Sequence, residues 1–202
     1  VETYPSLLLI GPTGAGKTSL INLLMRFFEP SSRRILVNSR DIREWDLAHL
    51  RSRTALVMQE SLLLSRTVRE TLLQGDPSLH EEDMHRILQE SHCRGLVQKL
   101  PQGLDTVLAG YGGSISTGER QLLSIARAMA RDPDLLILDE ATSSIDSETE
   151  QIIQLALERL MQGRSSITIA HRLATARKAD RIYVLHKARI VESGSHQDLL
   201  AR

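Results

Sequence analysis

Short apolar runs alternate with longer segments of helical periodicity along the 202-residue chain. Residues 6–10 (SLLLI) form an apolar run directly before a glycine-rich segment, which is typical of a buried parallel strand. Residues 17–28 then carry apolar side chains at helical spacing. Further strands are predicted at residues 34–38, 54–58, 134–140, 165–170 and 180–186. This alternation favours an α/β fold with a mainly parallel sheet.

The middle of the chain departs from the alternation. From residue 61 to residue 131 the pattern is mostly helical, and residues 81–92 and 118–130 are the clearest helices. Strand patterns precede and follow this stretch, and the sequence shows neither an internal repeat nor a low-complexity linker. We therefore expect a single domain over residues 1–202, with a helical subdomain inserted at roughly residues 61–131.

Composition excludes several classes of protein. Lys plus Arg number 25, as do Asp plus Glu, whereas a protein whose main partner is nucleic acid needs a basic surface. The single cysteine, Cys93, rules out an internal disulfide framework and is typical of a reducing compartment. No apolar run approaches the roughly 20 residues of a membrane-spanning helix, and no signal-peptide pattern is present. Because a strand pattern begins almost at once, without a methionine, we expect the chain to be a domain of a longer protein.

A glycine-rich segment follows the first predicted strand. Residues 11–18 (GPTGAGKT) fit G-x-x-x-x-G-K-[ST] between a strand and a helix, which is the setting of a phosphate-binding P-loop. We expect backbone N–H groups to surround the β-phosphate, Lys17 to reach the β- and γ-phosphates, and the Thr18 hydroxyl to ligate Mg²⁺. The residues expected around the nucleotide are Gly11, Pro12, Thr13, Gly14, Ala15, Gly16, Lys17, Thr18 and Ser19. By itself the motif predicts a nucleoside-triphosphate site.

Polar residues stand at the ends of three further predicted strands. Asp139 and Glu140 end the strand at 134–140, and ligands of open α/β sheets bind at that edge. We expect Asp139 to hold Mg²⁺ through water and Glu140 to polarise the water that attacks the γ-phosphorus. Gln59 and His171 follow two other strands, and each alone is more typical of a capping or surface residue. With four strand ends facing one crevice, we expect Gln59 to ligate Mg²⁺ and reach the attacking water, and His171 to donate to the γ-phosphate.

A second segment is built to contact an anion. In residues 112–121 (GGSISTGERQ), two glycines lead to Ser116 and Thr117, and then to Gly118 and Glu119, before a helical run begins. A Ser or Thr near a glutamate at a helix start offers N-cap chemistry, and the exposed N–H groups of a helix start attract phosphate. The sequence therefore predicts a second phosphate contact, about a hundred residues after the first.

Taken together, these motifs resemble the ATP-binding cassette (ABC) ATPases over nearly the whole chain. The family's Walker A, Q-loop, signature, Walker B, D-loop and H-loop correspond in order to residues 11–18, Gln59, residues 116–119, Asp139 with Glu140, Asp146 and His171. The resemblance implies the RecA-like P-loop NTPase fold, with ATP and Mg²⁺ as cofactors. It also implies that two such domains, identical or distinct, pair head to tail. Each signature segment then binds the ATP held by the partner's P-loop, and Asp146 lies along the interface.

A closer resemblance is to the cassettes of exporters whose membrane helices are fused in the same chain. The segments LLMRFFEP, TVRETLLQGDP and IAHRLATARKADRIYVLHKARIVESGSHQDLL are similar to that branch. It implies an ATP-hydrolysing motor at the cytoplasmic face of a membrane. It also implies that the helical insertion receives the transmembrane domain near the segment from Glu60 to Thr67.

Three departures from the family pattern bear on activity. The usual signature is Leu-Ser-Gly-Gly-Gln, whereas this chain has Thr117 and Glu119 at the third and fifth positions; Glu119 places a negative charge near a triphosphate. Gly110 stands where exporter cassettes often carry a glutamate. The family's antiparallel β-subdomain, with the aromatic residue that stacks on adenine, is expected before the P-loop and outside this chain, so no adenine contact is assigned.

Two other functions compete with the exporter motor. A soluble DNA-repair or chromosome-maintenance ATPase head also carries a signature helix, but a long coiled coil separates that helix from the Q-loop. No heptad run lies between Gln59 and Ser116 in this chain. A binding-only cassette would use ATP as a structural switch; the presence of Lys17, Glu140 and His171 argues against it, while Glu119 leaves room for it.

Overall fold

The computed structural model describes residues 5–58, 66–108, 115–140, 145–170 and 173–201. The chain divides into two compact units. We call Val1–Ala55, Asp134–Glu140 and Ser165–Arg202 the sheet unit, and Leu56–Pro133 with Ala141–Arg164 the helical unit.

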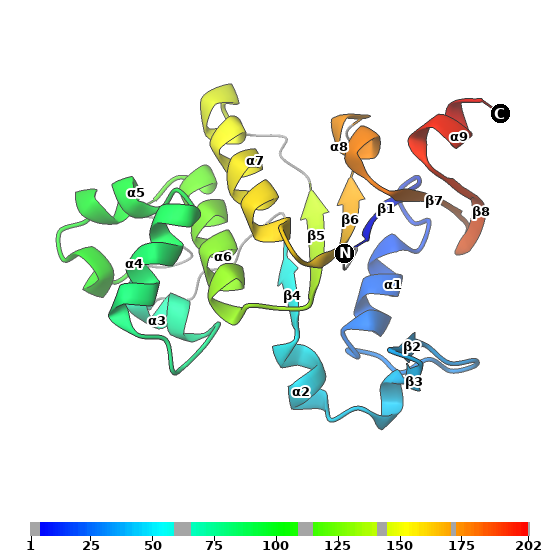
Figure 1. The fold of residues 1–202 in the computed structure, drawn as a ribbon, viewed down its shortest axis with the longest axis horizontal. Coiled ribbons are helices and arrows are strands. Elements are labelled where there is room, and N and C mark those ends of the chain that lie inside the picture. Colours follow the sequence, from blue (N-terminus) through cyan, green and yellow to red (C-terminus); the bar gives the residue numbers. More distant parts are fainter. Residues whose placement is uncertain (1–4, 59–65, 109–114, 141–144, 171–172, 202) are drawn as a thin grey trace. The chain divides into compact units, whose positions relative to one another are not determined.

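A mainly parallel sheet organises the sheet unit (Figure 1), which confirms the predicted fold class. The strand order is β4-β5-β6-β1-β7-β8. Strand β1 pairs in parallel with β6 and β7, β5 pairs in parallel with β6, and β8 runs antiparallel to β7. The strands of this sheet are β1 (Ser6–Ile10), β4 (Thr54–Val57), β5 (Leu135–Glu140), β6 (Ser165–Ala170), β7 (Arg181–His186) and β8 (Arg189–Gly194).

The central strands are buried on both faces, as their unbroken apolar runs predict. Leu8 is completely buried and packs with Ala176 and Ile182, so that α8 (Leu173–Lys178) covers β1 and β7. In β5, Leu136, Ile137 and Leu138 are also buried. Each Å² of apolar surface removed from water stabilises the fold by roughly 25 cal/mol. Burial of these apolar residues therefore holds in place the strands that end at the candidate site.

Two elements of the sheet unit are shorter than the sequence predicts. Helix α1 (Lys17–Leu24) ends before residue 28 because Arg26 adopts a left-handed conformation, with φ 49°. The strand predicted at 34–38 is reduced to β2 (Leu36–Val37), which pairs with β3 (Arg40–Asp41) in a separate two-stranded sheet. Asn38 and Ser39, with φ 51° and 64°, form the tight two-residue turn that ends β2. The remaining elements of this unit are η1 (Ile42–Glu44), α2 (Leu47–Ser52) and α9 (His196–Leu200).

Helix α6 (Thr117–Arg131) is the centre of the helical unit. It has ten buried residues and contacts three other helices of the unit. The other elements are α3 (Val68–Leu73), α4 (Glu81–Glu90), α5 (Arg94–Lys99), η2 (Gly103–Asp105) and α7 (Ser147–Met161). Helix α7 was not among the clearest predicted helices. Its buried residues Ile153, Ala156, Leu157 and Leu160 have the spacing of a single helix face.

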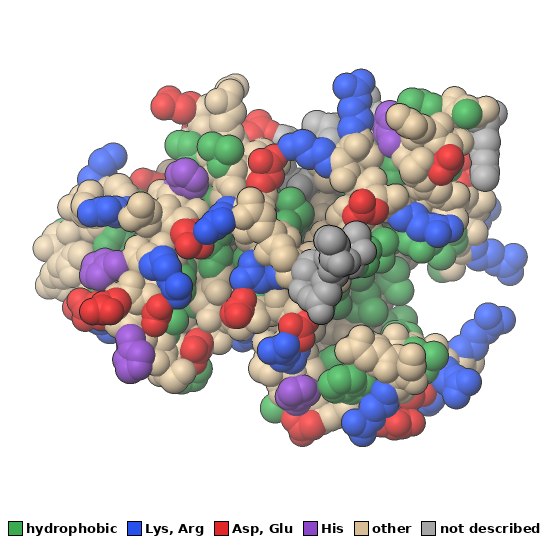
Figure 2. All heavy atoms as spheres, in the orientation of Figure 1, with side chains coloured by type: hydrophobic (Ala, Val, Ile, Leu, Met, Phe, Trp, Pro, Cys, Tyr) green, Lys and Arg blue, Asp and Glu red, His purple; other side chains and the backbone are tan. Residues whose placement is uncertain are grey.

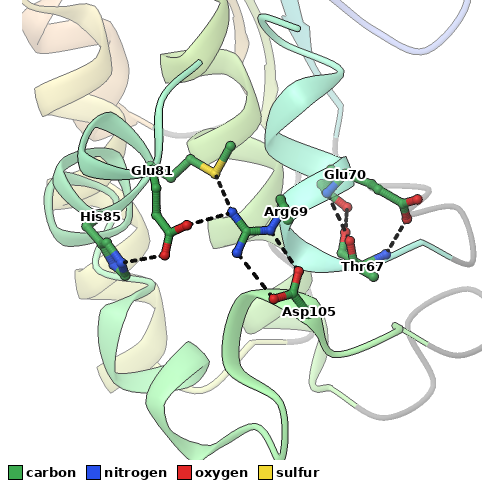
Figure 3. A network of polar contacts seen from close by, with 8 residues as sticks. Thr67, Arg69, Glu70, Glu81, His85 and Asp105 are labelled. Carbon is green, nitrogen blue, oxygen red and sulfur yellow. Dashed lines mark hydrogen bonds and ion pairs between the residues drawn. The ribbon is translucent and has the colours of Figure 1, made fainter. Parts of the chain in front are cut away.

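Arg69 joins three elements of the helical unit (Figure 3). Its guanidinium donates to Asp105 Oδ1 at 2.7 Å and to Glu81 Oε2 at 3.1 Å, which links α3 to η2 and to the start of α4. The hydrogen bond to Asp105 raises the pKa of Arg69, so the guanidinium stays charged. Nearby, Thr67 and Glu70 form a reciprocal capping box at the start of α3. The helices are thus joined by polar contacts as well as by their apolar core.

Cys93 is completely buried just before α5, and burial raises its pKa to about 12. On the face shown in Figure 2, acidic and basic side chains are interspersed over the helices of this unit. Within the described residues, no helix has both the length and the apolar character needed to cross a membrane.

Candidate functional site

The loop from β1 to α1 carries the predicted phosphate contacts. Gly16 is the N-cap of α1, with φ 100°, a conformation that favours glycine. The helix start has no side-chain cap and no acidic residue in its first turn. Its N–H groups are therefore available to an anion, and the helix dipole favours negative charge there. Of the remaining predicted contacts, Pro12, Thr13, Gly14, Thr18 and Ser19 are exposed, and Ala15 is buried.

Lys17 is buried within this loop, with 8% of its surface exposed. Its ammonium donates to the carbonyl oxygen of Gly11 at 2.6 Å and to that of Pro12 at 3.1 Å. Both acceptors belong to the loop itself, so the positive charge is held at the place where phosphate oxygens are expected. An anion entering the loop would compete with neutral carbonyl groups for this ammonium, and charged acceptors form the stronger hydrogen bonds.

The acidic pair lies at the same edge of the sheet as the loop. Across the adjacent strands β1, β6 and β5, the register aligns Leu9 with Ile169 and Ile169 with Asp139. Two strand spacings of about 4.8 Å place Asp139 about 10 Å from Leu9 along the sheet. The loop begins two residues after Leu9, and Glu140 follows Asp139. The sheet therefore brings the acidic pair to the carboxyl end where the phosphate loop begins.

Not every predicted site residue is described by the structure. Gln59, His171 and Gly110 lie outside the described residues. Glu140 ends β5, but its side chain lies outside the described part. Within the described residues, no group of three or more His, Cys, Asp or Glu side chains is arranged to hold a metal ion. A magnesium ion bound with a nucleotide does not need such a group, because phosphate oxygens and water supply most of its ligands. The hydroxyl of Thr18 and the carboxylate of Asp139 are oxygen donors of the kind that Mg²⁺ takes.

The predicted second phosphate contact forms the start of α6, in the helical unit. Ser116 is the N-cap: its Oγ accepts from Glu119 N–H at 3.2 Å, and the Glu119 carboxylate accepts from Ser116 N–H at 2.8 Å. The Glu119 carboxylate is therefore folded back onto the helix start, where the dipole favours negative charge. Arg120 donates to Thr117 Oγ1 and to the Ile115 carbonyl, both at 2.9 Å, and adds a positive charge at the same helix end. Both charges lie beside the backbone groups that would meet a phosphate.

Asp146 begins α7 in the same unit. Its carboxylate accepts from Thr149 N–H at 2.9 Å, and this hydrogen bond lowers its pKa. Thr149 in turn lies against Gly118, because a Cβ added to Gly118 would overlap the Thr149 Cγ2 methyl group. The start of α6 and the start of α7 are therefore packed together through a glycine.

Replacing Gly118 by alanine is expected to lower the free energy of unfolding of the helical unit by up to about 2 kcal/mol. The added methyl group overpacks this contact at a cost of about 1–3 kcal/mol, and the gain of roughly 1 kcal/mol in helix propensity offsets only part of that cost. The variants Gly118→Ala, Thr149→Ser and the double variant should be compared by urea unfolding. Serine lacks Cγ2, so the double variant should recover most of the loss. A double variant no more stable than Gly118→Ala would contradict this packing argument.

One contact of the phosphate loop was not predicted. The Ala188 N–H, in the turn between β7 and β8, donates to the Ala15 carbonyl at 3.0 Å. A carbon atom at the Cβ position of Gly11 would overlap the carbonyl oxygen of Leu185, in β7. Contacts between segments that are distant along the chain have no signal in a single sequence.

A phosphate loop between the first strand and helix of a mainly parallel sheet, with an acidic pair at the same edge, defines a P-loop nucleotide-binding protein. Residues 2–143 match the family model described as ABC transporter, and the chain belongs to this family, to its ATP-binding part. The order of motifs in the sequence agrees with that assignment.

Relatives in the family include ABC transporter proteins and a lipid A-core flippase. The chain is 46% identical over 200 residues to the uncharacterized ABC transporter ATP-binding protein YfiC of Bacillus subtilis, covering 99% of this chain and 33% of that protein. It is 47% identical over 201 residues to the fatty acid ABC transporter ATP-binding/permease protein of Mycobacterium bovis, covering 100% and 32%. It is 45% identical over 193 residues to the ATP-dependent lipid A-core flippase of Syntrophus aciditrophicus, covering 96% and 32%. The chain thus spans about a third of the length of these relatives.

A solved structure shows the same fold. The structure of a bacterial Atm1-family ABC exporter with ATP bound superposes with a TM-score of 0.88 at 35% identity, covering 98% of this chain and 35% of that chain. The likeness therefore extends over both units of the chain and not only over the phosphate loop.

Proposed function

We propose that this chain binds and hydrolyses ATP as the motor domain of a membrane exporter. The observation that carries the proposal is the register of β1, β6 and β5, which brings the phosphate loop and the Asp139–Glu140 pair to the same edge of the sheet. The fused ATP-binding/permease relatives support it. In this proposal the domain works in a pair, at the cytoplasmic face of the membrane that holds the transmembrane part.

Binding depends on the loop and the helix that it begins. The Lys17 ammonium leaves the Gly11 and Pro12 carbonyls for the β- and γ-phosphates, while N–H groups at the start of α1 surround the β-phosphate. Thr18, Gln59 and Asp139 would hold Mg²⁺, the last through water. Bound there, Mg²⁺ neutralises charge that develops on the phosphate oxygens.

Hydrolysis depends on the residues at the neighbouring strand ends. The Glu140 carboxylate accepts a proton from the attacking water, and Gln59 orients that water. His171 donates to the γ-phosphate and holds it in line for attack. These roles rest on residue type and position at the sheet edge.

Pairing uses the start of α6. Ser116 and Gly118 of one domain contact the γ-phosphate of the ATP held by the partner, and Asp146 lies along the interface. ADP lacks the γ-phosphate, so the paired state has a differential affinity for ATP that can drive a cycle. The capped Glu119 carboxylate lowers the positive potential at this helix start, so we expect weaker pairing than glutamine would give.

The transmembrane partner would meet the segment from Glu60 to Thr67. Only Arg66 and Thr67 of this segment are described; Thr67 is the N-cap of α3. In the sheet unit, Phe27 and Phe28, three and four residues after the end of α1, are 49% and 65% exposed. Adjacent exposed aromatic side chains favour a protein partner over water.

Hydrolysis is expected to fall at least about a hundredfold in EDTA, because the transition state would lose the cation that neutralises its developing charge. Phosphate release by the unmodified chain should be measured with excess ATP, before and after chelation. Added MgCl₂ should restore the rate, which controls for irreversible damage. Turnover that persists without divalent cation would refute the metal assignment of Thr18, Gln59 and Asp139. Tight ATP binding without any phosphate release would favour the binding-only cassette that Glu119 suggests.

A further inference from the structure

The turn between β7 and β8 has an unfavourable sequence for its backbone conformation. His186 pairs with Arg189, which leaves Lys187 and Ala188 as a two-residue turn with φ 47° and 58°. Two-residue hairpin turns with both φ values positive strongly prefer Asn-Gly, because side chains with a Cβ disfavour this region. Neither Lys187 nor Ala188 is an asparagine or a glycine, so contacts with other parts of the chain must stabilise this turn.

The turn rests on the phosphate loop (Figure 1). The Ala188 N–H donates to the Ala15 carbonyl at 3.0 Å. A Cβ built on Gly16 would lie 3.3 Å from Ala188 Cα and 3.4 Å from Ala188 Cβ, so the two backbones are in direct contact. Ala15 itself is 2% exposed. The phosphate loop is thus in contact with a turn that lies more than 170 residues later in the chain.

This hydrogen bond fixes the orientation of the Ala15–Gly16 peptide group in the phosphate loop. In a trans peptide, the carbonyl of one residue and the N–H of the next point in opposite directions. Because the Ala15 carbonyl points at Ala188, the Gly16 N–H must point away from the turn. Gly16 is the N-cap of α1, where an N–H directed into the loop can meet a phosphate.

We propose that Ala188 is a positioning residue for the nucleotide. Its backbone N–H holds the Ala15–Gly16 peptide in the phosphate-binding orientation, and the left-handed turn is retained because it delivers that N–H. The inference rests on the proposed nucleotide binding and adds a residue outside the family motifs. The Ala188 side chain has no part in it, so a side chain that keeps the turn should preserve binding.

The test replaces Ala188 by lactic acid, its ester analogue, which removes the N–H and keeps the side chain. Binding of Mg-ADP to the full 202-residue chain is measured by calorimetry. The ester at position 188 should weaken binding about tenfold, which corresponds to one hydrogen bond of about 1.4 kcal/mol. The matched control is the same ester at Ala201, whose N–H donates to Gln197 in α9, and it should change the affinity less than about twofold.

Two side-chain variants test the same idea without an ester. Ala188→Gly keeps the N–H and suits the left-handed turn, so it should bind Mg-ADP at least as tightly as the unmodified chain and melt higher. Ala188→Val disfavours the turn and should weaken binding, with circular dichroism used to confirm folding. An ester at 188 that lowers the melting temperature but leaves Mg-ADP affinity unchanged would overturn the proposal, since the role would then be structural alone. Failure of the unmodified chain to bind Mg-ADP would instead refute the proposed function.

Discussion

Replacing Glu140 by glutamine is expected to lower ATP turnover by about 10²–10⁴-fold while ATP binding remains, because the amide is nearly isosteric but accepts no proton from water. With hydrolysis blocked, the paired state should persist. Light scattering should show a monomer without nucleotide and a dimer with Mg-ATP. Phosphate release measured on the same sample gives the loss of turnover.

The control for Glu140 is Glu192→Gln, which removes a charge from an exposed position on β8 of the same unit. It should change neither turnover nor mass. Unchanged turnover in Glu140→Gln would refute the catalytic role of this residue. A variant that binds ATP but stays monomeric would mean that two copies of this chain do not pair without further parts of the protein. The capped Glu119 would then be the first residue to change.

Replacing Lys17 by alanine is expected to weaken Mg-ATP binding by about a hundredfold or more, with hydrolysis lost in parallel. The ammonium is buried among loop carbonyls, where a charge-assisted hydrogen bond to phosphate is stronger than at a surface. Affinity should be measured by calorimetry, and the melting temperature should be recorded because the Gly11 and Pro12 carbonyls also lose their donor. Lys99→Ala, which removes an exposed lysine in the helical unit, should leave the affinity unchanged. Equal affinities in the two variants would show that Lys17 does not contact the nucleotide.

Sequence periodicity predicted the buried strands of the sheet because burial on both faces leaves a continuous apolar run, whereas the largely exposed strand β8 was not predicted. The runs at 6–10 and 134–140 became β1 and β5 with at most one residue of difference. Helix ends were harder to predict. Apolar spacing continues through Met25, Phe27 and Phe28, yet α1 stops because Arg26 turns left-handed. Such turns depend on the contacts of a few backbone groups rather than on side-chain pattern.

The parts of the candidate site that depend on particular side chains in a fixed order along the sequence were predictable. The phosphate loop and the acidic strand end needed only the motif and the rule that parallel strands share an edge. The position of Glu119 was predictable in part, because a serine near a glutamate at a helix start offers capping chemistry. Its charge suggested repulsion of phosphate, and the structure shows a capping box with Ser116. The support from Ala188 was invisible, because a backbone N–H has no residue type to recognise.

Burial of Cys93 offers a route to watching domains pair. Burial raises the pKa of the Cys93 thiol, which disfavours the reactive thiolate, and the side chain has no exposed surface. Thiol reagents should therefore leave it unmodified in the folded protein. A cysteine introduced at Leu155, which is 53% exposed on α7, would be the single attachment point for a spin label. The distance between labels on two copies would then report ATP-dependent pairing without removal of the native thiol.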